Sequence, residues 1–97
     1  MYFFVDGLKL GEVFASRAHA KVLQFLLENP GKAFSLRYLA RVTGVAPSTV
    51  GIVIDNYEKL GIILLRKLPS VNMIMLNHEN PVTQALLQLV ERIRAVS

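Results

Sequence analysis

The stretch FSLRYLARVTGVAPSTVGIVIDNYEKLG occupies residues 34–61 and contains two helical patterns joined by a tight turn. Ser35 has the chemistry of a helix N-cap, and apolar residues follow it at helical spacing. Gly44 comes next, in the position where helices often end in the left-handed conformation. Pro47 suits the first turn of another helix, which Gly61 ends. The stretch therefore predicts two short helices separated by a glycine turn.

The second of these helices is expected to bury one face. Its apolar residues recur at the spacing of a single helix face: Val50, Val53, Ile54, Tyr57 and Leu60. Tyr57 is thus predicted to be a core residue rather than a platform for stacking a nucleic-acid base. Its hydroxyl is expected at the rim of the core, where it can form a hydrogen bond.

The flanking sequence predicts a helix before this pair and a hairpin and helix after it. Ser16 can cap a helix that ends at residues 29–31, Asn-Pro-Gly. After Gly61, two strand-like runs at residues 62–68 and 72–76 flank a short turn, which is typical of a hairpin. Asn80 and Pro81 then predict the start of a helix that fills the C-terminus. Residues 1–10 are compatible with either a strand or an arm that folds back.

The composition indicates one globular domain. The chain has 97 residues, of which 53% are hydrophobic and 19% charged, which excludes a disordered chain. There is no Cys, so disulfide frameworks and thiolate metal sites are excluded. No signal peptide or membrane span is recognisable, so a cytoplasmic protein without membrane association is expected. Eleven Lys and Arg against seven Asp and Glu give a net charge of +4, which makes a nucleic-acid partner worth testing.

We expect residues 1–97 to form this single domain in three parts. They are an N-terminal arm at 1–15, a core at 16–77 and a C-terminal dimerisation helix at 81–97.

The order of these elements is that of a winged helix-turn-helix domain, an α+β fold that is mostly α, with a two-stranded wing and here an extra C-terminal helix. Residues 34–41 and 44–50, FSLRYLAR and GVAPSTV, resemble the helix-turn-helix signature of MarR- and ArsR-like regulators. Residues 60–63, LGII, are similar to their turn into the wing. The resemblance covers roughly residues 16–77, and it extends to winged helices found beside nucleotidyltransferase domains. It implies a transcriptional regulator that binds double-stranded DNA, with the third helix (47–60) in the major groove and the wing (62–76) on the backbone.

The candidate DNA-binding residues follow from this resemblance. Ser48, Thr49 and Ile52 share one face of the third helix, where hydroxyls can bond to base edges and Ile52 can contact a thymine methyl. Asp55 continues that face. The alternative is that Ser48 and Thr49 cap the helix while Ile52 is buried against a partner. The expected phosphate contacts are Lys32, Arg37, Arg41, Arg66 and Lys67.

The C-terminal helix carries a heptad-like apolar seam, which consists of Val82, Leu86, Leu89, Ile93 and Val96. A minimal winged helix is already closed before this segment, so something else must cover the seam. We expect a homodimer contact there, or else packing of the helix back on its own domain.

No pattern indicates an enzyme. There is no nucleophile–base constellation, no phosphate-binding glycine loop and no paired carboxylates, and His19 and His78 do not form a metal motif. We therefore expect neither catalysis nor a metal nor another cofactor. The rival to the DNA-binding hypothesis is a winged-helix module that binds a protein partner and never contacts DNA.

Overall fold

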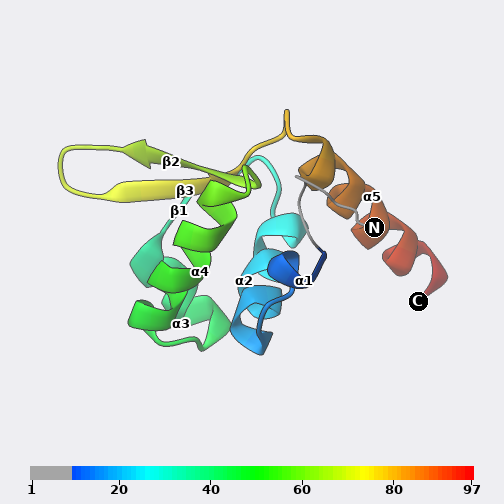
Figure 1. Cartoon of the computed structure of the whole chain (residues 1–97), viewed down its shortest axis with the longest axis horizontal. Helices are drawn as coiled ribbons and strands as arrows, with labels where there is room; N and C mark the ends of the chain where they lie inside the picture. The colour runs from blue at the N-terminus through cyan, green and yellow to red at the C-terminus, as the bar shows by residue number, and fades with distance from the viewer. Residues whose placement is uncertain (1–9) are drawn as a thin grey trace.

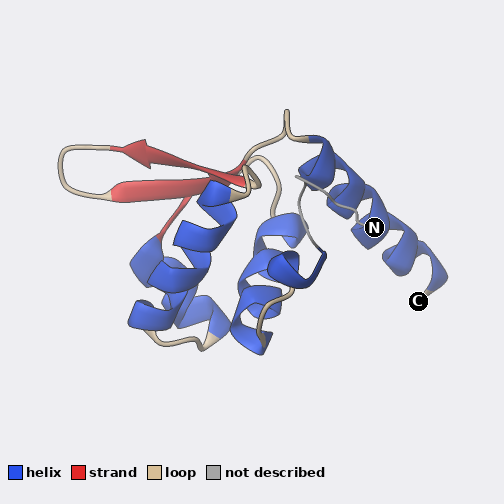
Figure 2. Ribbon diagram, viewed as in Figure 1, coloured by secondary structure: helices blue, strands red, loops and turns tan. Residues whose placement is uncertain are grey.

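The computed structural model describes residues 10–97, and these form five helices and three strands (Figure 1). The elements are α1 (Leu10–Val13), α2 (Arg17–Glu28), β1 (Phe34–Ser35), α3 (Leu36–Thr43), α4 (Pro47–Lys59), β2 (Ile63–Lys67), β3 (Asn72–Leu76) and α5 (Pro81–Val96). The hairpin β2–β3 projects to one side of the α2–α3–α4 bundle, and α5 lies at the other side (Figure 2). The predicted order of helices and hairpin is confirmed. The alternatives for residues 1–10 fall on residues outside the described part of the chain, except for Leu10, which begins α1.

The predicted helix ends are confirmed by their capping contacts. The hydroxyl oxygens of Ser16 and Ser35 accept hydrogen bonds from the backbone N–H groups at the starts of α2 and α3. The Asn80 side-chain oxygen accepts from two N–H groups in the first turn of α5, at 2.7 and 3.2 Å. Gly44 and Gly61 have φ angles of 73° and 78°, in the left-handed region that favours glycine. These ends could be predicted because each depends on contacts with near neighbours in the chain.

The sheet has one strand more than the wing alone. β2 and β3 form the expected hairpin, and β1 pairs with β3 through Phe34 opposite Ile74 and Ser35 opposite Met73. The strand order is therefore β1-β3-β2, and all pairs are antiparallel. A strand of two residues carries no periodic signal, and β1 forms because tertiary packing brings it beside β3.

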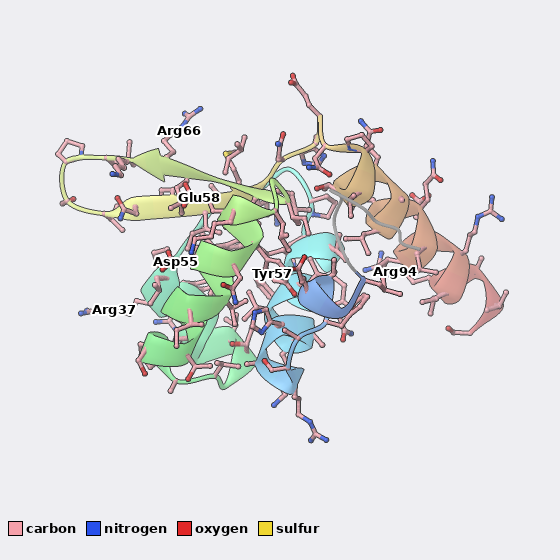
Figure 3. The ribbon with its side chains drawn as sticks, in the orientation of Figure 1. Arg37, Asp55, Tyr57, Glu58, Arg66 and Arg94 are labelled. Atoms are coloured by element: carbon pink, nitrogen blue, oxygen red, sulfur yellow. The ribbon has the colours of Figure 1, made fainter. Side chains whose placement is uncertain are left out.

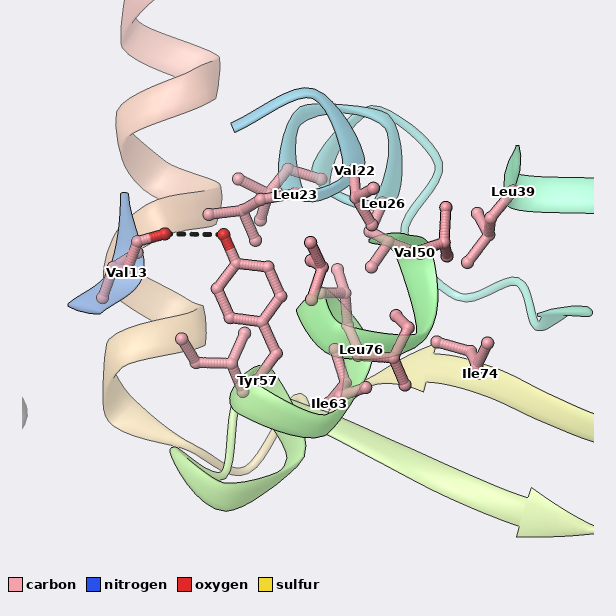
Figure 4. Close-up of a cluster of buried hydrophobic side chains, with 14 of the residues drawn as sticks. Val13, Val22, Leu23, Leu26, Leu39, Val50, Tyr57, Ile63, Ile74 and Leu76 are labelled. Carbon is pink, nitrogen blue, oxygen red and sulfur yellow. Dashed lines mark hydrogen bonds between the residues drawn. The ribbon is translucent and has the colours of Figure 1, made fainter. Parts of the chain in front are cut away.

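The core lies between α2, α4 and the hairpin, and Figure 4 shows its centre. Tyr57 is completely buried there, as predicted. Its hydroxyl is not at the rim, however, but 2.6 Å from the carbonyl oxygen of Val13 and 2.9 Å from that of His19. α1, which lies within the segment expected to be an arm, supplies the first of these acceptors. Burial raises the pKa of the Tyr57 hydroxyl well above its usual range.

The first turns of α5 are anchored to the domain, whereas its last turns are not. The Thr83 hydroxyl is buried and donates to the Ile62 carbonyl oxygen at 3.2 Å. Leu86 is also buried, but Leu89 and Ile93 are 50% and 53% exposed. The seam predicted for this helix is thus divided, because only its first half reaches the core. No helix in the described part of the chain is long and apolar enough to cross a membrane.

Candidate nucleic-acid interface

The face of α4 that points away from the core opens into a hollow beside the wing. Ser48, Ile52 and Asp55 follow one another at helical spacing along this face, and all three are exposed. The hollow has a volume of about 820 Å³ and lies between α3, α4 and the hairpin. Ser48 and Thr49 do not cap α4, because the helix begins after Ala46 without a side-chain cap. Thr49 is half-buried and does not line the hollow.

Two further elements contribute polar groups to the hollow. Arg37 lines it at the start of α3, and Ser70 and Asn72 line it at the tip of the wing. Lys67 pairs directly with Asn72 across the hairpin. Directly paired residues project to the same side of a sheet, so Lys67 lies on the face of the wing that borders the hollow. Ser70 and Asn72 have no signal in the sequence beyond their place at the hairpin turn.

Arg66 lies on the opposite face of the wing. It pairs with Met73, and its neighbours on that face are Leu64 and Met75, which also form a cross-strand pair. In Figure 3 the Arg66 side chain points away from α4 and from Arg37. The structure therefore separates Arg66 from Lys67, although the two are adjacent in sequence.

Arg41 and Lys32 lie outside the hollow. The Arg41 guanidinium is 5.0 Å from the centre of the Tyr38 ring, which is close enough for a cation–π contact. Arg41 and Arg37 also line a second, shallow hollow of about 500 Å³ around the turn between α3 and α4. Arg37 thus borders both hollows, whereas Lys32 is exposed in the loop before β1.

His19 is buried, and its imidazole contacts side chains from two helical segments. The Ser16 hydroxyl oxygen lies 2.8 Å from Nδ1 of His19, and the Asn56 amide nitrogen lies 2.9 Å from Nε2. These contacts join α2 to α4, and desolvation lowers the pKa of the imidazole. Among residues 10–97, no group of three or more His, Asp or Glu side chains could hold a metal ion.

A second surface has a different character and lies between α2 and α5. This groove has a volume of about 370 Å³ and is lined mainly by apolar side chains, including Phe14, Leu23, Leu27, Leu86, Leu89 and Ile93. Glu28 and Arg94 also border it. Three residues of the predicted α5 seam therefore line one groove, while Val96 at the end of the helix is 85% exposed.

Comparison with known proteins identifies the fold. No family model and no curated protein matches the sequence. HlyU from Vibrio cholerae N16961 has a similar structure, with a TM-score of 0.69 and 18% identity over 87% of this chain and 85% of that chain.

Two further solved structures are similar. The homodimeric winged helix-turn-helix DNA-binding domain of Mb0332 from Mycobacterium bovis, a possible ArsR-family transcriptional regulator, matches with a TM-score of 0.66 and 15% identity over 88% of this chain and 74% of that chain. AF1382 from Archaeoglobus fulgidus matches with a TM-score of 0.66 and 14% identity over 91% of this chain and 96% of that chain. The chain has the winged helix-turn-helix fold that these structures share.

Proposed function

We propose that this protein is a cytoplasmic DNA-binding transcriptional regulator that acts as a homodimer. In this proposal α4 enters the major groove and the β2–β3 wing follows the phosphate backbone. The observation that carries it is the hollow beside α4, which is lined by the basic residue Arg37, by Ser48 and by the exposed Ile52. The chain also shares its fold with the DNA-binding domain of Mb0332 and with HlyU.

The division of labour follows from the chemistry of these groups. Arg37 and Lys67 contact phosphates and set the position of the domain, since phosphate contacts are independent of sequence. Ser48 bonds to a base edge, and Ile52 contacts a thymine methyl. Thr49 lies outside the hollow and is given no base contact. Arg41, in the last turn of α3, adds a contact to the DNA phosphate backbone. Arg66 lies on the opposite face of the wing and contributes less to phosphate binding than Lys67 does.

The dimer is proposed to form through the groove between α2 and α5. Leu89, Ile93 and Val96 are at least half exposed, and a second protomer would remove them from water. Two α4 helices that enter successive major grooves should be about 34 Å apart and prefer an inverted repeat with half-site centres about 10 base pairs apart. Sedimentation at micromolar concentration should give a dimer, and Ile93→Glu should give a monomer.

Binding to selected and random DNA duplexes across a range of salt concentrations tests the DNA contact. We assume phosphate contacts from Arg37, Arg41 and Lys67 in each protomer. The logarithm of the binding constant K should then fall against the logarithm of the salt concentration with a slope of about −5. Lys67→Ala should weaken binding to all sequences and flatten the slope by about 2 units per dimer. Arg66→Ala is the matched control, because it removes the same charge from the opposite face of the wing, and its effect should be smaller.

A second candidate is a protein-binding winged-helix module. The observation that favours it is exposed apolar surface, with Ile52 at 60%, Leu64 at 47% and Leu68 at 45% exposure. A salt slope near zero together with no preference among selected duplexes would support this module and contradict the DNA-binding proposal.

A further inference from the structure

Asp55 is an acidic residue in the middle of the surface proposed to receive a polyanion. It is exposed and lines the hollow beside α4, which Arg37 also lines. Figure 3 labels both side chains. Among residues 10–97, no hydrogen bond or ion pair occupies its carboxylate. If DNA occupies the hollow, the Asp55 carboxylate repels its phosphates. A favourable contact between Asp55 and the DNA is therefore needed to offset this repulsion.

The major groove favours such a contact at one type of base. A carboxylate accepts hydrogen bonds and donates none. In the major groove, guanine presents two acceptors and thymine presents an acceptor and a methyl group. Adenine presents its N6 donor beside the N7 acceptor, which repels a carboxylate, whereas cytosine presents the N4 donor alone. Cytosine is therefore the base with the fewest acceptors beside its donor, because N4 neighbours only the O6 of the paired guanine, whereas adenine N6 lies between N7 and the O4 of the paired thymine.

The spacing along α4 relates this contact to the one proposed for Ile52. Asp55 is three positions after Ile52, which corresponds to about 4.5 Å along a helix. Successive base pairs are about 3.4 Å apart, so the two side chains can address neighbouring pairs. The geometry points to Asp55 as a specificity-determining residue, which selects cytosine in the base pair next to the one that Ile52 contacts. This inference rests on the proposed DNA-binding function.

Selection of binding sites from random duplexes, followed by affinity measurements with each base at each position, tests this assignment. The wild-type dimer should prefer cytosine at one position in each half-site, by about 10-fold over the other bases. Asp55→Asn should change that preference to adenine, because an amide can accept from N6 and donate to N7. The positions outside this pair should keep their preferences.

Glu58→Gln is the matched control. Glu58 lies three residues further along α4, is exposed and does not line the hollow. Its neutralisation should raise the affinity for all duplexes without changing any base preference. Thermal melting checks that both variants fold like the parent, as expected for exposed side chains.

Two results would overturn the inference, and they differ in what else they affect. If Asp55→Asn and Glu58→Gln raise the affinity for all duplexes alike, Asp55 only repels phosphate, and the DNA-binding function stands. If the wild-type protein binds DNA without salt dependence or base preference, both the inference and the proposed function are wrong.

Discussion

The two faces of α4 have the same backbone and opposite surroundings. One face is buried and contains Val50, Val53, Ile54 and Tyr57. The other contains Ser48, Gly51, Ile52 and Asp55, which line the hollow beside the wing. Ile52 is 60% exposed and Ile54 is 3% exposed, although they are the same residue type two positions apart. Because Ile52 and Asp55 are exposed, their side chains contribute little to the core and are accessible to a binding partner.

Polar groups differ between the two faces in the same way. On the core side, the Tyr57 hydroxyl and the Asn56 amide have partners in the α1–α2 region. On the open side, Asp55 has none among the described residues. Buried polar groups need hydrogen-bond partners to avoid a desolvation penalty, whereas exposed polar groups are hydrated and can bind an external partner.

The largest expected effect uses the two isoleucines. Ile54→Ala should lower the free energy of unfolding by about 2–5 kcal/mol, because it leaves a cavity in the core. Ile52→Ala should change it by no more than about 0.5 kcal/mol. Urea denaturation measures both, and equal losses would contradict the division into two faces. DNA affinity measured on folded protein should show the reverse order.

The next effect concerns the hydrogen bonds of the buried face. Tyr57→Phe keeps the ring but removes the hydroxyl from the Val13 and His19 carbonyl oxygens. We expect a loss of about 1–3 kcal/mol in the free energy of unfolding, since a buried acceptor loses its donor. Tyr38→Phe, at a more exposed ring, is the control and should have little effect. A Tyr57→Phe variant as stable as the parent would show that the contact with α1 is dispensable.

Two glycines at α4 should respond in opposite directions to the same change. A Cβ at Gly61 would meet the Asn80 amide nitrogen at 2.8 Å, and φ is +78°, so Gly61→Ala should cost about 1–2 kcal/mol. A Cβ at Gly51 would make only an ordinary contact with Leu36 at 3.8 Å. Gly51→Ala should therefore raise the free energy of unfolding by up to about 1 kcal/mol. Thermal melting measures both shifts, and a destabilised Gly51→Ala would mean that the open face is more tightly packed than its geometry indicates.

The last prediction concerns pH. Desolvation lowers the pKa of His19 below the ordinary value of 6.5, so the unfolded chain takes up a proton at a higher pH than the folded chain. The stability contributed by neutral His19 is full above about pH 6.5 and falls as the pH decreases toward the folded value. Urea denaturation across this range should show the loss. His19→Gln should remove this component, whereas His78→Gln, at an exposed loop residue, should keep it. The opposite slope in the parent would contradict the assigned direction.

Local patterns in the chain were sufficient for most of the architecture. Ser16, Ser35 and Asn80 cap their helices through contacts no more than three residues away. The buried face of α4 follows from helical periodicity, which depends only on residue order. These features are readable from sequence because their physical causes lie within one or two helical turns.

Tertiary structure alone decided where the candidate site residues face. β1 depends on a partner strand about forty positions later, and the acceptors of the Tyr57 hydroxyl are 38 and 44 positions away. The hairpin register places Lys67 on the side of the hollow and Arg66 on the opposite side. The α5 seam divides because Leu86 reaches the core, whereas Leu89 and Ile93 are exposed in the groove between α2 and α5. An amino-acid pattern fixes which residues share a face of an element, but the packing of distant elements determines what that face meets.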